Sequence, residues 1–224
     1  MSITVFTVVF NNYGMFVRQW LENLKKQVIQ PKAIIVLGKE PGITAEEVLK
    51  LADGLETKVV HSESDVMGTL RNCAVEQVDT NYRLYFSVDD ILLPEATKEI
   101  LDTGADVVAL KYKDIATNGK ETLKTSWTFI PDEILHWRKK GDAPGYVAVN
   151  GEYYYEDTEM PNLPFLFQLA TKKLNQVTTE NVVALYKRRA DSHGGRSFRT
   201  GKCPHFAKII DEYAVAILQK YQES

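Results

Sequence analysis

The sequence is poor in cysteine and has no long apolar run, and both absences narrow the class of protein. It has only two cysteines, Cys73 and Cys203, in 224 residues, and they form no CxxC pair. We therefore expect two reduced thiols rather than a disulfide framework or a thiolate metal site. No stretch approaches the roughly 18 apolar residues that a membrane span needs, and the strand-like start of the chain carries no positively charged leader. These features predict a cytoplasmic protein without a signal peptide.

The sequence also lacks an excess of basic residues. The formal net charge is −3, which argues weakly against a dedicated nucleic-acid binder. One segment departs from this balance, because residues 187–202 carry six Lys or Arg and only one acid, Asp191. With 44% hydrophobic and 25% charged residues, the composition is that of a globular protein, and the length suits one large domain.

The first ninety residues alternate strand and helix patterns. Apolar and β-branched runs predict strands, and apolar residues at helical spacing predict helices between them. Thr44 and Glu47 have the spacing of a capping box, which predicts a helix start. This order predicts right-handed βαβ crossovers and an α/β fold with a mostly parallel sheet. The predicted strands cover residues 3–10, 33–37, 57–61 and 83–88, and the helices cover about 16–28, a segment after 44, and 68–78.

The pattern is less regular after residue 90. We predict a short helix over residues 94–104, and a strand over 106–113 that returns over 124–130 after the Asn118-Gly119 turn. A last strand is predicted over 182–186. Further helices are predicted over 131–139, 165–174 and 207–221. With no repeat and no linker, the economical interpretation is one domain over residues 1–224, with halves at 1–90 and 91–224.

The most informative pair of residues is Asp89-Asp90, which follows an apolar strand. In open α/β sheets, ligands bind beyond the carboxyl ends of the strands. Two carboxylates there suit a hard divalent cation, which prefers oxygen ligands. A purely structural reading has about equal weight, since Asp also caps helices and one is predicted to begin near Pro94.

Five segments, taken in order, resemble the inverting family 2 of GT-A glycosyltransferases. No one segment is specific, but their order and spacing match the family over almost the whole chain. They are TVVFNN (7–12), GTLRNCA (68–74), YFSVDD (85–90), YED (155–157), and LYKRR (185–189) with the following His193 and Ser197.

The resemblance implies a GT-A domain with a nucleotide-binding half and an acceptor-binding half, the latter ending in a lid and a helix. It implies a nucleoside diphosphate sugar donor and a Mn²⁺ or Mg²⁺ ion, with Asp89 and His193 at the metal. Asp90 would support the metal or contact the sugar, and Phe10 would pack against the base. The donor contacts implied overall are Thr7, Phe10, Asn11, Arg71, Asp90, Arg196 and Arg199.

The resemblance also implies roles in the acceptor half. Asp157, with Glu156 beside it, would remove the proton from an acceptor hydroxyl. The arginines would close over the leaving diphosphate on the Gly194-Gly195 segment, because their planar forks match phosphate oxygens. The acceptor class stays open among a glycan, a lipid-linked precursor and a hydroxylated DNA base.

Structural explanations remain for single residues. Phe10 would be a core residue, Arg71 an outward helix charge, His193 a surface histidine, and Asp157 part of a solvated acidic loop.

Two departures from the family affect donor recognition. Leu37-Gly38-Lys39 stands where the family has acids that read the base, and Ser87 replaces the first acid of the DxD motif. They motivate an alternative, a catalytically silent GT-A-like protein that binds a nucleotide or glycan. A nucleotidyltransferase is a weaker alternative, because residues 10–14 (FNNYG) lack its glycine-rich loop.

Overall fold

The computed structural model describes residues 1–64, 66–125, 146–155 and 174–187, with the single residues 165, 169 and 172. The predicted helices at 131–139 and 207–221, and most of the one at 165–174, lie outside these residues. No helix in the described ranges is long and apolar enough to span a membrane. The elements are β1 (Ile3–Val9), a 3₁₀ turn (Tyr13–Phe16), α1 (Val17–Lys25), β2 (Lys32–Leu37), α2 (Ala45–Leu51), β3 (Thr57–His61), α3 (Met67–Val75), β4 (Tyr82–Tyr85), β5 (Ile91–Leu92), α4 (Ala96–Thr103), β6 (Val107–Ile115), β7 (Glu121–Thr125), β8 (Val147–Asn150) and β9 (Gln176–Lys187).

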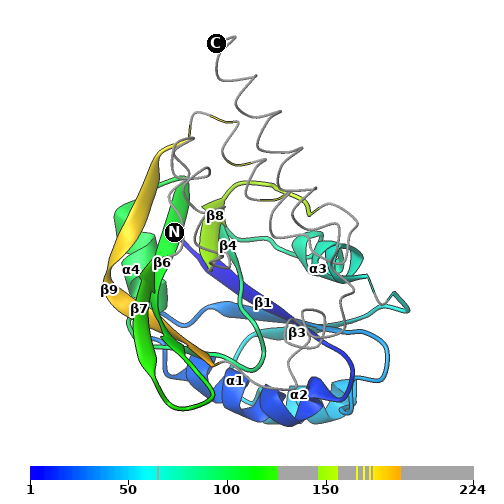
Figure 1. The fold of residues 1–224 in the computed structure, drawn as a ribbon. Coiled ribbons are helices and arrows are strands. Elements are labelled where there is room, and N and C mark those ends of the chain that lie inside the picture. Colours follow the sequence, from blue (N-terminus) through cyan, green and yellow to red (C-terminus); the bar gives the residue numbers. More distant parts are fainter. Residues whose placement is uncertain are drawn as a thin grey trace, which may run out of the picture.

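The described strands form one curled, mixed sheet of nine strands (Figure 1). Its order is β3-β2-β1-β4-β8-β6-β9-β5, and β7 lies off this path, paired with the second half of β6 beyond the residues that pair with β8. The first four strands pair in parallel, as the sequence predicts for residues 1–90. The second half is mixed, because β8 runs antiparallel to both β4 and β6, while β6 and β9 are parallel.

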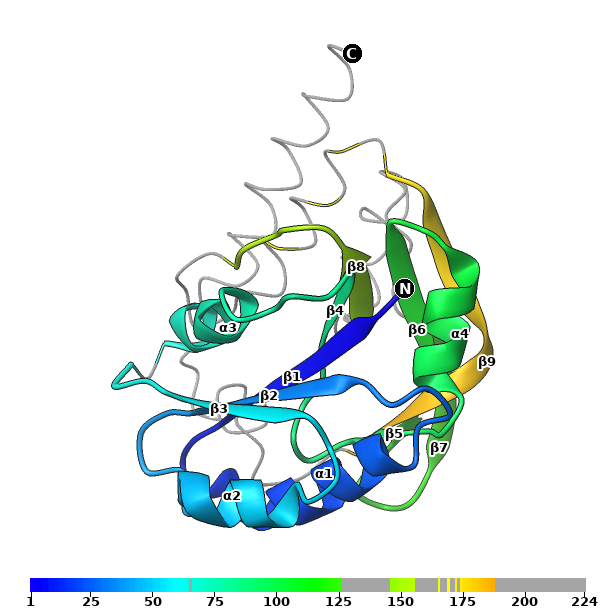
Figure 2. The same cartoon turned by 180° about the vertical axis from the view of Figure 1, so that it is seen from behind.

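Helices cover both faces of the parallel half of the sheet. α1 and α2 lie on one face and α3 on the other, as the two opposite views show (Figures 1 and 2). β1 is buried along its whole length, and its side chains alternate between the two cores. Val5 and Val9 pack with the α1 side, whereas Phe6 and Val8 pack with the α3 side. This double burial explains why the sequence of β1 is a continuous apolar run.

Helix α1 is shorter than the sequence predicts. It ends at Lys25, and Val28, predicted on its apolar stripe, is 55% exposed. The reason is Gln27, whose Nε2 donates to the backbone carbonyl of Leu93 (2.9 Å) and whose Oε1 accepts from the amide of Thr97 (3.2 Å). The buried amide group of Gln27 therefore connects the end of α1 to the start of α4.

The local signals in the sequence are confirmed, whereas the short strands are not anticipated. Thr44 and Glu47 form the complete capping box of α2. Gly104 follows the last residue of α4, and its φ of 61° is left-handed, as expected for a glycine after a helix. The short strands β5 and β8 are absent from the sequence-based prediction. β4 ends at Tyr85 rather than at residue 88, and β9 has 12 residues.

Candidate functional site

Parallel pairing brings the carboxyl ends of β1, β2 and β4 to one edge of the sheet. β1 pairs with β2 on one side and β4 on the other, so the chain leaves all three strands at this edge. The segments that follow are residues 10–16, 38–44 and 86–90. They carry most of the described residues that the sequence analysis assigns to the site.

The segments after β1 and β2 are bonded to each other. The amides of Asn11, Asn12 and Gly14 donate to the carbonyls of Lys39 (3.1 Å), Glu40 (2.7 Å) and Pro41 (2.8 Å). Left-handed φ angles permit this arrangement, and they occur at three residues that are not glycine, namely Asn11 (50°), Asn12 (63°) and Glu40 (48°). Left-handed backbone is unfavourable outside glycine, although asparagine tolerates it best. The two segments therefore form one ordered surface.

An aromatic pair lies beside this surface. The rings of Phe10 and Tyr13 are stacked, with centroids 6.3 Å apart and an interplanar angle of 10°. Phe10 is 9% exposed, so most of its side chain is buried, as the alternative of a core residue predicts. Asn11 is exposed. Thr7 is fully buried within β1, three residues before the edge-lining Phe10.

Asp89 lies at the end of the chain segment that continues β4. It is 8% exposed, and the Ser87 hydroxyl donates to its Oδ1 at 2.8 Å. The amide of Asp90 donates to the carbonyl of Ser87 (3.2 Å), which closes a turn over residues 87–90. The Asp89 carboxylate is thus held by a neighbouring side chain and by a hydrogen-bonded backbone turn.

Asp90 has a different environment from Asp89. It is 1% exposed, and its Oδ1 accepts from the backbone amide of Lys187 at 2.8 Å. Its Oδ2 accepts a short hydrogen bond from the Tyr146 hydroxyl. Burial and the Asp90 charge raise the pKa of Tyr146 well above its usual value, so this phenol remains a donor. Asp90 therefore joins the end of the β4 segment to the residue before β8 and to the last residue of β9.

Arg71 points into the interior rather than outward from α3. It is 4% exposed, and its Cζ lies 3.6 Å from the centroid of the Tyr85 ring and 5.0 Å from that of Tyr155. This geometry is that of a cation–π contact. Burial raises the pKa of Tyr155 to about 12. The interpretation of Arg71 as an outward helix charge is therefore wrong.

The residue after Arg71 contacts the segment that precedes the predicted catalytic acids. Asn72 Nδ2 donates to the carbonyl of Tyr155, and Asn72 Oδ1 accepts from its amide, both at 2.8 Å. Tyr155 also stacks on Phe165, with centroids 4.4 Å apart. Tyr155 and Phe165, which flank residues 156–164 in the sequence, are therefore in contact. Sequence reasoning assigns no role to Asn72, because its partner lies 83 residues away.

Several predicted site residues lie outside the part of the chain that the structure describes. They include both acids proposed for proton transfer and the basic residues of the predicted lid. They are Glu156, Asp157, His193, Arg196 and Arg199. The described residue nearest in sequence to the acids is Tyr155, and the one nearest to the lid is Lys187, whose amide is bonded to Asp90.

The donor set of the described residues suits a cation that is bound mainly by its substrate. Across these residues, no group of three His, Cys, Asp or Glu side chains could by itself enclose a metal ion. Asp89 offers one oriented carboxylate, whereas both oxygens of Asp90 accept protein hydrogen bonds. Mg²⁺ in nucleotide sites typically uses one or two carboxylates, substrate phosphates and water. The residues present fit that mode and do not form a closed cage.

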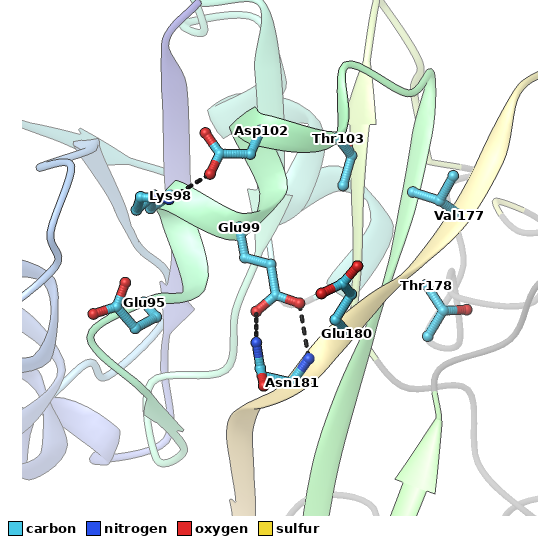
Figure 3. A pocket seen from close by; sticks show the side chains of 9 residues that line it. All are labelled: Glu95, Lys98, Glu99, Asp102, Thr103, Val177, Thr178, Glu180 and Asn181. Atoms are coloured by element: carbon cyan, nitrogen blue, oxygen red, sulfur yellow. Dashed lines mark hydrogen bonds and ion pairs between the residues drawn. The ribbon is translucent and has the colours of Figure 1, made fainter.

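A separate hollow lies between α4 and the first half of β9 (Figure 3). Its volume is about 740 Å³, and it is lined mainly by polar and acidic side chains. Glu99 accepts from the backbone amide (2.9 Å) and the Nδ2 (3.2 Å) of Asn181, which ties α4 to β9. None of the predicted site residues that the structure describes lines this hollow.

Comparisons of sequence identify one distant relative. No protein-family model matches the chain. A protein of Bacillus subtilis (strain 168) named "Putative glycosyltransferase EpsH" is 26% identical over 129 residues, which is 55% of this chain and 36% of EpsH. The chain thus spans about a third of the length of that relative.

Comparisons of structure extend over most of the chain. The crystal structure of S. aureus TarS 1-349 matches 84% of the chain and 60% of TarS 1-349, with a TM-score of 0.67 and 18% identity. TarS has also been solved with UDP-GlcNAc. The mannosyltransferase PcManGT from Pyrobaculum calidifontis, in complex with GDP-Man and Mn²⁺, matches 98% of the chain and 68% of PcManGT, with a TM-score of 0.61 and 14% identity. The fold of this chain is the GT-A fold of glycosyltransferases, as the resemblance in its sequence predicts.

Proposed function

We propose that the chain is a metal-dependent glycosyltransferase that moves a hexose from a nucleoside diphosphate sugar to a hydroxyl acceptor, with inversion at the anomeric carbon. The observation that carries this proposal is Asp89, an oriented carboxylate at the carboxyl edge of a GT-A sheet. The structural neighbours support the class of donor and the metal, since TarS is solved with UDP-GlcNAc and PcManGT with GDP-Man and Mn²⁺.

The donor nucleotide is proposed to lie on the surface formed by the segments after β1 and β2. Phe10, stacked on Tyr13, offers an aromatic edge to the base, and the exposed Asn11 lies next to it. Lys39 follows β2 where the family has acids that read the base. We therefore propose a nucleoside diphosphate donor without choosing between UDP and GDP.

The diphosphate is proposed to lie over Asp89. A bound Mn²⁺ or Mg²⁺ would stabilise the negative charge that develops on the leaving diphosphate as the glycosyl–phosphate bond breaks. Asp89 would hold that ion, and His193 is proposed as a further ligand. Arg196 and Arg199 are proposed to donate to the phosphate oxygens, where fixed donors stabilise the developing charge.

The acceptor is proposed to enter from the side of residues 155–157. Asp157, with Glu156 beside it, would take the proton of the acceptor hydroxyl, which typically contributes about 10²- to 10⁴-fold. Attack on the face opposite the diphosphate would then invert the anomeric carbon. The proposed acceptor is a glycan, a lipid-linked precursor or a hydroxylated DNA base.

Donor turnover tests this proposal. The chain is incubated with UDP-GlcNAc or GDP-mannose, with and without Mn²⁺ or Mg²⁺, and release of the nucleoside diphosphate is followed. We expect metal-dependent hydrolysis or transfer with one donor, which Asp89→Asn removes and Asp53→Asn, at an exposed loop position, retains. The absence of turnover across a panel of UDP- and GDP-sugars would contradict an active transferase.

Ser87 in place of an acid, together with Lys39, favours an alternative, a catalytically silent protein that binds a nucleotide. Binding and turnover measurements on Asp157→Asn separate this alternative from an active enzyme. That alternative predicts that a nucleoside diphosphate and Mn²⁺ bind, and that Asp157→Asn changes nothing. An active enzyme predicts that Asp157→Asn retains binding and loses turnover.

A further inference from the structure

Ser87 is the residue at which the chain departs from the acidic motif of the family, and the structure gives its hydroxyl a specific contact. The Ser87 Oγ donates to Asp89 Oδ1 at 2.8 Å. A hydrogen bond from a hydroxyl to a carboxylate is charge-assisted and stronger than one between neutral groups. The contact therefore restricts rotation of the carboxylate that the proposed function assigns to the metal.

The backbone on which this contact depends is itself fixed. The amide of Asp90 donates to the carbonyl of Ser87, and the Asp90 carboxylate accepts from Tyr146 and from the amide of Lys187. The turn that carries Asp89 is therefore closed by a backbone hydrogen bond and anchored through the Asp90 carboxylate. The Ser87 hydroxyl adds a side-chain contact that restricts the orientation of the Asp89 carboxylate.

The identity of residue 87 also sets the charge of the site. An acid there would bring a second negative oxygen toward Asp89 Oδ1, and the two charges would repel without a cation between them. Serine donates a proton at the same place and leaves one negative charge on the pair. Asp90 adds no open charge, because both of its oxygens accept hydrogen bonds.

We propose that Ser87 is a positioning residue that orients Asp89 toward a divalent cation, so that the cation binds well only together with a nucleoside diphosphate. This inference rests on the proposed function, in which Asp89 holds the cation. In the sequence motif, Ser87 is recognisable only as a missing acid, whereas its contact with Asp89 gives it a role.

Binding of Mn²⁺, followed by the electron paramagnetic resonance signal of the free ion, tests the inference without a turnover assay. The protein is titrated with Mn²⁺ alone and with Mn²⁺ plus UDP or GDP. We expect the wild type to bind Mn²⁺ more tightly with one nucleotide than without. Loss of an outer partner of a metal ligand typically weakens metal binding about 10- to 100-fold. Ser87→Ala is expected to show a loss of that size, and Ser87→Thr, which keeps the hydroxyl, is expected to restore most of the affinity.

The outcomes separate the inference from the proposed function. If wild type and Asp89→Asn bind Mn²⁺ equally with each nucleotide, both are overturned. If Asp89→Asn loses binding but Ser87→Ala matches the wild type, the proposed function stands and the role of Ser87 is overturned. Ser2→Ala, at an exposed position, is the matched control, and melting temperatures establish that each variant is folded. A Ser87→Thr variant that is folded and binds as weakly as Ser87→Ala would also overturn the role of the hydroxyl.

Discussion

Asn72 and Tyr155 are joined by a pair of hydrogen bonds that closes a ring between a helix side chain and a distant backbone. The side-chain amide of Asn72 donates to the Tyr155 carbonyl and accepts from its amide, both at 2.8 Å. Arg71, which precedes Asn72 on α3, has its Cζ 5.0 Å from the centroid of the Tyr155 ring. Consecutive residues of α3 therefore hold one point of the chain, two residues before the proposed base Asp157.

Asn72→Ala is expected to lower the free energy of unfolding by about 1–3 kcal/mol, because it leaves the amide and carbonyl of Tyr155 without these partners. Chemical denaturation measures the change. Asn175→Ala is the matched control, since this exposed side chain makes no hydrogen bond within the described residues, and its effect should stay within about 0.5 kcal/mol. Equal stability of the two variants would contradict a structural role for the Asn72 contact.

The buried tyrosines predict a loss of stability at alkaline pH. Burial raises the pKa of Tyr155 to about 12, whereas a phenol in an unfolded chain has a pKa near 10. The contribution of Tyr155 to the free energy of unfolding is therefore fully present below about pH 10. It is lost as the pH rises toward 12, because the phenol loses its proton at a lower pH in the unfolded chain than in the folded one.

Tyr155→Phe keeps the ring and removes this titration. The decline of unfolding free energy with pH should become shallower, by at most about 1.4 kcal/mol per pH unit for one proton. Urea denaturation between pH 9 and about 11.5 measures the slope, and Tyr154→Phe, at an exposed ring, is the control. A Tyr155→Phe slope equal to that of the wild type would show that the buried phenol does not cause the decline.

The interlocked loops after β1 and β2 make Gly14 sensitive to substitution. A Cβ at Gly14 would lie 2.7 Å from the Pro41 carbonyl oxygen and 2.8 Å from backbone atoms of Gly42. A Cβ at Gly38 would meet side-chain atoms instead, the two Leu70 methyls at 3.1 and 3.4 Å and the Phe10 Cβ at 3.4 Å. Backbone atoms held in a hydrogen-bonded ladder yield less easily than a side chain.

We therefore expect Gly14→Ala to destabilise the protein by about 1–3 kcal/mol, as overpacking does, and Gly38→Ala to cost less. Gly14→Ala should also weaken UDP or GDP binding, measured by calorimetry, because it separates the two loops on which the nucleotide is proposed to lie. A folded Gly14→Ala variant that binds UDP or GDP as tightly as the wild type would contradict that location.

The sequence predicts local features of this fold better than distant contacts. The Thr44–Glu47 capping box and the glycine that ends α4 are recognisable because the interacting residues are close in the chain. β8 escapes prediction since its four residues are defined by pairing with β4 and β6, whose residues are remote in sequence.

The candidate site divides in the same way. The motif identifies Asp89 and Asp90 as a pair, but their different environments depend on Tyr146 and on the amide of Lys187, which lie 56 and 97 residues from Asp90. Ser87 is recognisable in the sequence only as a missing acid. Its contact with Asp89 follows from the turn that the backbone forms at the end of β4.

These different environments predict opposite effects for the neighbouring acids. Asp89→Asn should lower the unfolding free energy less than Asp90→Ala does, since an amide oxygen still accepts from Ser87. It should reduce turnover at least about a hundredfold, the scale seen when one electrostatic contact to a developing charge is lost. Asp90→Ala should lower stability instead, because the Tyr146 hydroxyl and the Lys187 amide each lose a buried partner, at about 1–3 kcal/mol per group.

Tyr146→Phe provides a milder version of the Asp90 change, because it removes one donor and keeps the ring that lies 4.4 Å from Phe86. Its loss of stability should be smaller than that of Asp90→Ala, while Mn²⁺ binding with a nucleoside diphosphate is retained. Denaturation curves and Mn²⁺ titrations of the three variants therefore form one experiment. If Asp90→Ala lost Mn²⁺ binding at full stability, while Asp89→Asn was destabilised and still bound the ion, the assignments of the two acids would have to be exchanged.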